Sequence, residues 1–205
     1  MLKLYYYPGA CSLAPHLVLD WAGAPYEAAR VKLGDPAYLA VNPAGAVPAL
    51  DTGEGWVLTQ AAAILRYLAR RFPEARLGPD ASPREEAEFD RWSNFLTGDL
   101  HPSFRPLFAP QRFTTAQDAA ALEAVKTAGA ALVEKQLALI DAHLADKDHM
   151  VGGRRSYLDA YALPMFRWAR AMLPRGLASH SNCERLLTRL EAEPATKKVL
   201  ADEGL

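Results

Sequence analysis

The sequence has little cysteine, since its 205 residues include only Cys11 and Cys183. Two thiols are too few for the disulfide framework of a small secreted protein. They also lie too far apart along the chain to form a Cys-x-x-Cys metal or redox pair. We therefore expect both thiols to be reduced, with Cys183 a buried structural residue, and we expect no metal site.

The sequence also lacks an excess of charge of either sign, with 23 Lys and Arg residues against 24 Asp and Glu residues. This balance gives no general attraction to nucleic acid or to an anionic membrane, so neither is expected as a partner. No apolar run reaches the ~18–20 residues that span a membrane, and the first residues do not follow the pattern of a secretion signal. We expect a cytoplasmic protein whose partner is a small molecule.

What is present is the composition of a globular protein, with 50% hydrophobic and 23% charged residues. Residues 1–76 read as strand, helix, strand, short helix, hairpin and helix, which predicts a mixed sheet with helices on its faces. Prolines and a glycine interrupt the periodic spacing of hydrophobic residues around 77–83, and we interpret this segment as a linker. Residues 84–205 carry only helical periodicity. The sequence thus predicts an α/β domain followed by an all-α domain.

Three helix signals in this pattern are specific enough to test. Ser12 is placed to cap a helix that ends near Gly23, and helical spacing of aromatic residues predicts one helix over Pro83–Leu100. Ser156 and Asp159 have the spacing of a capping box in front of an apolar run. The cap explains both residues, so we interpret them as structural.

Cys11 lies between the strand predicted over Lys3–Tyr7 and the helix after Ser12. The positive end of a helix lowers the pKa of a nearby thiol, so this position favours a reactive cysteine. A small buried residue without chemistry is the alternative. No second cysteine follows in the motif, so any sulfur partner of Cys11 must come from outside the chain.

Other candidate positions are weaker on their own. Gln60 and Ala61 stand where a strand gives way to a helix whose first N–H groups suit a carboxylate, although most helix starts bind no ligand. Val47 precedes Pro48 at the start of a predicted strand. His101 follows a long helix and is surrounded in sequence by aromatic residues that form either core or an apolar pocket.

The order of these segments resembles the soluble glutathione transferases, most closely the bacterial beta class. The resemblance covers nearly the whole chain and is carried, in order, by KLYYYPGACSLAPHLVL, NPAGAVPAL, LTQAAAILRYLA, LHPSFRPLF and the Ser156–Asp159 cap. It implies a thioredoxin-like N-terminal domain that binds glutathione and a helical C-terminal domain that forms most of the second-substrate site. It also implies a cytosolic homodimer that conjugates glutathione to hydrophobic electrophiles in detoxification, with glutathione as co-substrate and no permanently bound cofactor.

The resemblance also implies roles for individual residues. It places Cys11 and His101 beside the glutathione sulfur, with Ser12 and Tyr6 as further donors to it. The residues implied to contact glutathione are Cys11, Val47, Pro48, Gln60, Ala61, Asn94, Gly98, Asp99, Leu100 and His101. The implied second-substrate pocket is formed by Trp92, Phe95, Phe104, Phe108, Tyr161 and Phe166.

The sequence departs from the family pattern at positions that are expected to bind the two ends of glutathione. The segment 33–44 is short and lacks lysines, Ala44 replaces a basic or polar residue, and Ala61 replaces a serine or glycine. A lost charge-assisted hydrogen bond costs about 1.5–3 kcal/mol, so glutathione is expected to bind weakly unless Arg30, Lys32 or an arginine of a partner chain compensates.

Two alternatives to conjugation therefore stay open. One is thiol-disulfide exchange or deglutathionylation through Cys11, and the other is a non-catalytic binding protein whose glutathione site has decayed.

Overall fold

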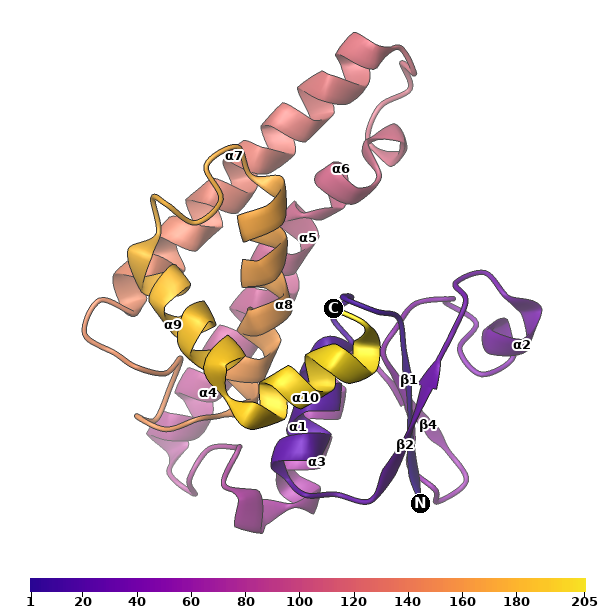
Figure 1. The fold of residues 1–205 in the computed structure, drawn as a ribbon, viewed down its shortest axis with the longest axis vertical. Coiled ribbons are helices and arrows are strands. Elements are labelled where there is room, and N and C mark those ends of the chain that lie inside the picture. The colour runs from indigo at the N-terminus through magenta and orange to yellow at the C-terminus, as the bar shows by residue number, and fades with distance from the viewer.

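The computed structural model describes all residues 1–205 and has a sheet-containing unit followed by a helical one (Figure 1). The first unit consists of β1 (Leu2–Tyr6), α1 (Leu13–Trp21), β2 (Tyr26–Arg30), α2 (Pro36–Leu39), β3 (Ala49–Asp51), β4 (Val57–Thr59), α3 (Ala61–Arg71) and the 3₁₀ turn η1 (Pro73–Ala75). The strand order is β2-β1-β3-β4, with β2 parallel to β1 and the other pairs antiparallel. The predicted mixed sheet is confirmed.

The helical unit begins at Pro83. It consists of α4 (Pro83–Phe95), the π-helical η2 (Leu96–Leu100), α5 (His101–Ser103), α6 (Arg105–Phe108), η3 (Pro110–Arg112), α7 (Ala119–His143), α8 (Tyr157–Met172), α9 (Ser181–Ala192) and α10 (Pro194–Glu203). The single helix predicted over Pro83–Leu100 therefore changes to π-helix at Leu96. Pro102 has no N–H for the carbonyl of Gly98, so a regular α-helical ladder cannot continue through this point.

The capping box at the start of α8 is confirmed. The Ser156 amide donates to Asp159 Oδ2 at 2.8 Å, and the Ser156 hydroxyl accepts from the Leu158 amide. Asp159 Oδ1 also accepts from the Met150 amide at 2.9 Å. All these groups are buried and paired, as expected for a structural role.

The two units share one hydrophobic core. The N-terminal helix α1 is buried along most of its length, packs against α3 and α8, and is covered by α10, which returns from the far end of the chain (Figure 1). A single cluster of 43 buried residues includes members of both units. No helix is long and apolar enough to cross a lipid bilayer. The helical unit therefore completes the packing of the sheet-containing one.

Candidate active site

A cavity of about 880 Å³ opens between the two units, and Cys11 and His101 both line it. The N-terminal unit supplies two walls: the first consists of residues Tyr7 to Cys11, and the second consists of Leu33, Gly34 and Leu39 around α2 with Ala44 to Val47 before β3. The helical unit supplies His101, Phe108, Arg112 and Trp168. The fold thus brings two of the four candidate catalytic residues, Cys11 and His101, to one cavity.

The turn before α1 is closed by Ser12. Its hydroxyl donates to the Tyr7 carbonyl and accepts from the Tyr7 amide, both at 3.2 Å, and its side chain is fully buried. It makes no side-chain capping bond to α1. Ser12 is therefore the N-cap residue of α1, as predicted, but its side chain does not cap the helix. The predicted role as a donor to a ligand sulfur is not supported, because the hydroxyl is already engaged within the turn.

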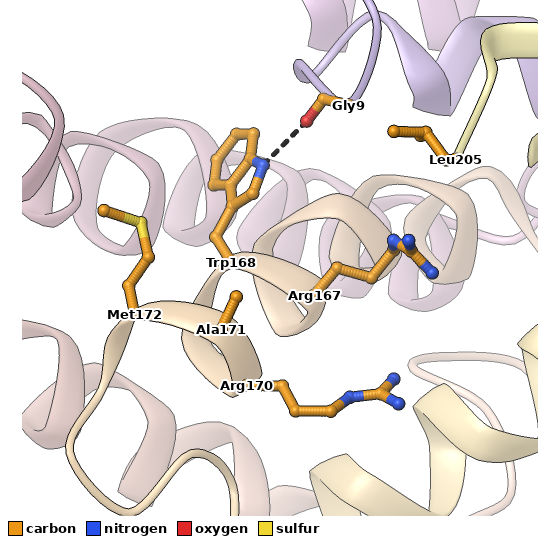
Figure 2. Close-up of a pocket in the computed structure, with 7 residues that line it drawn as sticks. All are labelled: Gly9, Arg167, Trp168, Arg170, Ala171, Met172 and Leu205. Atoms are coloured by element: carbon orange, nitrogen blue, oxygen red, sulfur yellow. Dashed lines mark hydrogen bonds between the residues drawn. The ribbon is translucent and has the colours of Figure 1, made fainter.

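The same turn is held by two helices of the second unit. Trp168 Nε1 of α8 donates to the Gly9 carbonyl at 2.8 Å, as Figure 2 shows. The Gly9 amide donates to Glu203 Oε2 of α10 at 3.0 Å, and Glu203 Oε1 lies 2.9 Å from His16 Nδ1. Gly9 has a φ of +69°, which suits a glycine. The turn that precedes Cys11 is thus fixed through both backbone polar groups of Gly9.

Cys11 is nearly buried, with 8% of its surface exposed, and its thiol donates to the Val47 carbonyl at 3.4 Å. Burial raises the pKa of this thiol to about 12. The expectation of a lowered pKa is wrong, because removing the thiolate from water outweighs the favourable helix end. At neutral pH Cys11 is therefore a protonated hydrogen-bond donor.

His101, at the start of α5, faces the same cavity in a neutral form. Burial lowers its pKa to about 4, with a smaller contribution from the charge of Arg105. Its Nδ1 lies 3.4 Å from the Tyr161 hydroxyl, and its ring centroid lies 5.2 Å from that of Trp168. The imidazole can therefore exchange hydrogen bonds with a ligand without bringing a charge into the cavity.

Val47, Pro48, Gln60 and Ala61 meet at one end of the β3–β4 pair. The Val47–Pro48 peptide is cis, and Ala49 pairs with Thr59, so the residues before β3 and after β4 are neighbours. Gln60 starts α3 with a φ of +71° and makes no side-chain capping bond. The first N–H groups of α3 are therefore available to a carboxylate beyond the Val47 edge of the cavity.

Several residues implied by the resemblance lie outside the cavity lining. Tyr6 is buried away from the cavity, where its hydroxyl lies 3.5 Å from the Asp202 carbonyl and its ring packs on His16. Asn94 and Asp99 line a separate hollow, Gly98 is exposed away from the cavity lining, and Leu100 is fully buried. The structure does not bring these residues to Cys11.

Of the six residues predicted to form the second-substrate pocket, only Phe108 lines the cavity. Phe104, Tyr161 and Phe166 are fully buried in the core, and Trp92 and Phe95 line the separate hollow. Aromatic residues at helical spacing fill the core first, and the spacing alone does not identify the member that faces outward.

Tyr7, Arg112 and Trp168 line the cavity although the sequence analysis did not select them. Trp168 follows Tyr161 by two helical turns of α8, so the two lie on one face, which could have been read from the sequence. Arg112 has no comparable signal. Arg30 and Lys32, the expected compensators, line a different depression beside α2.

The family comparisons agree with this architecture. The chain matches the family model described as "Glutathione S-transferase, N-terminal domain" over residues 9–71 and the corresponding C-terminal domain over residues 119–196.

Individual relatives match the chain over its whole length. Glutathione S-transferase GST-4.5 of Xanthomonas campestris is 37% identical, with 100% of both chains covered. The beta-class glutathione S-transferase of Sphingomonas chungbukensis and a sphingomonad glutathione S-transferase complexed with glutathione are each 34% identical, with a TM-score of 0.86 and 99% of both chains covered. These matches show that the chain belongs to the glutathione S-transferase family.

Proposed function

We propose that this glutathione transferase binds glutathione with its sulfur between Cys11 and His101 and conjugates it to an apolar electrophile. The observation that carries the proposal is the pairing of two neutral hydrogen-bonding groups on one cavity, a protonated thiol and an uncharged imidazole. A relative of the same fold has been solved with glutathione bound. Glutathione here acts as a co-substrate.

Two neutral donors suit the activation of a thiol that belongs to the ligand. The Cys11 S–H, now bonded to the Val47 carbonyl, can turn to the glutathione sulfur, and an imidazole N–H of His101 can donate to it from the other side. Hydrogen bonds to a thiolate stabilise the charged form and lower its pKa. Glutathione releases its thiol proton to solvent, the resulting thiolate attacks the electrophilic carbon, a C–S bond forms, and the leaving group departs with its electron pair.

The ends of glutathione have different anchors in this proposal. The backbone of Val47 pairs with the cysteinyl part, and the γ-glutamyl carboxylate meets the first N–H groups of α3 beside Gln60 and Ala61. Proximity supplies much of the rate, because both reactants are held in the same cavity.

The raised pKa of Cys11 favours conjugation over exchange through its own sulfur. Burial keeps this thiol protonated at pH 7, and the thiolate is the species that attacks a disulfide. Conjugation needs Cys11 only as a donor. Conjugation is therefore the better supported of the two reactions.

We propose further that the protein is a cytoplasmic homodimer that removes toxic electrophiles. Large apolar side chains stay exposed on the β4 hairpin and on α7, namely Trp56, Val57, Leu132 and Leu139. A homodimer interface would cover such side chains. Light scattering should give twice the chain mass for the wild type and a lower mass for Leu139→Glu, whereas a monomeric wild type rejects the dimer.

The catalytic proposal is tested by calorimetric titration with glutathione and by conjugation of 1-chloro-2,4-dinitrobenzene. We expect binding at millimolar glutathione or below, and we expect Cys11→Ala to keep conjugation at a rate reduced about 10-fold, since one hydrogen bond to the thiolate is lost. Cys183→Ala is the matched control, because its thiol is buried away from the cavity.

Three other results would change the conclusion. No binding at millimolar glutathione would leave a non-catalytic binding protein. If the conjugation rate of Cys11→Ala fell to the uncatalysed rate, the thiol of Cys11 would have to do more than donate a hydrogen bond. Disulfide reduction that disappears only in Cys11→Ala would favour thiol exchange.

A further inference from the structure

The charges that line the cavity are unbalanced. No Asp or Glu side chain lines it, His101 is neutral, and Arg112 is the one lining residue with a permanent charge. Arg112 makes no side-chain hydrogen bond or ion pair within the chain, whereas Arg66, Arg71 and Arg154 all have acidic partners. A cation without a partner on the wall of a cavity favours an anionic ligand.

Arg112 is placed beside the aromatic corner of the cavity. It ends η3, which follows α6 directly, and Phe108 at the end of α6 keeps 48% of its surface exposed. The rings of Phe108 and Trp168 are perpendicular, with centroids 5.1 Å apart. This corner offers two aromatic faces and one guanidinium to the same ligand, a combination that suits a planar ring with an acidic substituent.

We propose that the Phe108–Trp168–Arg112 corner selects a planar apolar electrophile that carries a carboxylate, with its ring against Phe108 and Trp168 and its carboxylate paired with Arg112. The proposal rests on the proposed conjugation of glutathione and names the class of its second substrate. The cavity-lining residues in and around α2, namely Leu33, Gly34, Leu39 and Ala44, are uncharged. The carboxylate therefore has one cationic partner in the cavity.

Glutathione itself is an anion, so Arg112 has a competing partner in its glycyl carboxylate. Arg30 and Lys32 line another depression. Arg112 is therefore also the one permanent cation of the cavity lining that could pair with the glycyl carboxylate. The position of Arg112 on the segment that carries Phe108 favours the second substrate. The two assignments differ in which reactant loses affinity when the charge is removed.

The test uses two electrophiles that differ in charge and little in shape, 4-chloro-3-nitrobenzoate and 4-chloro-3-nitrobenzamide. The variant is Arg112→Gln, and the matched control is Arg175→Gln, an exposed arginine outside the cavity lining. We expect Arg112→Gln to lower kcat/KM for the benzoate about 5- to 30-fold, to change it less than about 2-fold for the benzamide, and to leave glutathione affinity unchanged. Arg175→Gln should behave as wild type.

Two kinetic outcomes overturn the proposal. A rise in the KM for glutathione with both electrophiles would assign Arg112 to the glycyl carboxylate. Equal kcat/KM values for wild type and Arg112→Gln with the benzoate would make Arg112 a solvated surface charge.

A binding measurement keeps the proposal testable if conjugation itself fails. Calorimetric titration of wild type and Arg112→Gln with 3-nitrobenzoate and 3-nitrobenzamide needs no glutathione. We expect wild type to bind the benzoate more tightly by the same factor, and we expect the variant to lose that preference. Wild type that binds glutathione poorly but keeps the preference would reject the proposed function alone, and equal binding of both compounds would reject the carboxylate subsite.

Discussion

The two walls of the N-terminal unit that line the cavity are supported in different ways. Gly9 on the first wall is bonded to Trp168 of α8 and to Glu203 of α10, so the helical unit fixes it. The second wall, around α2, is held mainly by its own residues, with the Tyr38 hydroxyl and the Asn42 amide both donating to the Ala46 carbonyl at 2.6 Å.

The two walls also differ in how deeply their residues are buried. The wall that carries Cys11 is built into the shared core, whereas the wall around α2 leaves Leu33 and Leu39 exposed. Segments with few buried contacts open locally at lower free energy than segments of the core. In the proposed reaction, the glutathione sulfur would therefore lie against the more stable of the two walls.

The largest effect on stability is expected from removing the Glu203 carboxylate, which holds Gly9 of the first wall. Glu203→Ala leaves the buried His16 Nδ1 and the partly buried Gly9 amide without partners and should lower the free energy of unfolding by about 3 kcal/mol. Urea denaturation followed by circular dichroism measures this change. Asp202→Asn is the control, because its side chain is half exposed and should change stability by less than about 0.5 kcal/mol. Similar losses in both variants would show that Glu203 acts only as part of α10.

A smaller effect is expected from protonating His101 beside Trp168. The histidine has a pKa of about 4 in the folded protein against an ordinary value of 6.5, so the unfolded chain binds more protons between these values. The stability that His101 contributes is therefore lost as the pH falls from 6.5 towards 4. Between pH 7 and pH 5 the loss should be about 1–2 kcal/mol.

The measurement is the difference in unfolding free energy between pH 7 and pH 5 for wild type and His101→Asn. The variant should lose less stability than wild type over this range. Equal losses would contradict the lowered pKa and would assign the acid sensitivity to other groups.

The smallest effect is expected from adding a charge to the second wall. Ala44 lines the cavity and is exposed, so Ala44→Lys gives this wall a cation that can reach a carboxylate of glutathione. An exposed ion pair contributes about 0.2–1 kcal/mol, so calorimetry should show glutathione binding up to about 5-fold tighter. Ala46→Ser is an uncharged control on the same segment. Unchanged or weaker binding of Ala44→Lys would mean that the second wall does not face a carboxylate of glutathione.

The sequence predicted most of what depends on local pattern. Element order gave the mixed sheet and the helical unit, and the Ser156–Asp159 spacing gave the capping box, because each signal lies within a few residues. The junction position of Cys11 was also visible. The direction of its pKa shift was not, since it depends on residues that bury the thiol from other parts of the chain.

Two contacts that support the site, and that the sequence does not predict, join residues far apart along the chain. Glu203 meets His16 across 187 positions, and Trp168 meets Gly9 across 159. Nothing near either residue indicates these bonds. For the aromatic residues, helical spacing identified one face but not which neighbour covers it, so Phe104 and Phe166 became core while Phe108 stayed exposed.

The contact between Glu203 and His16 also sets the order in which the site matures during synthesis. A nascent chain leaves the ribosome N-terminus first, so the turn before Cys11 emerges long before α10 exists. Until Glu203 arrives, the Gly9 amide has no acceptor from α10, and closing a contact across 187 positions is slow. The turn before Cys11 therefore becomes part of a finished site only after α10 has been made.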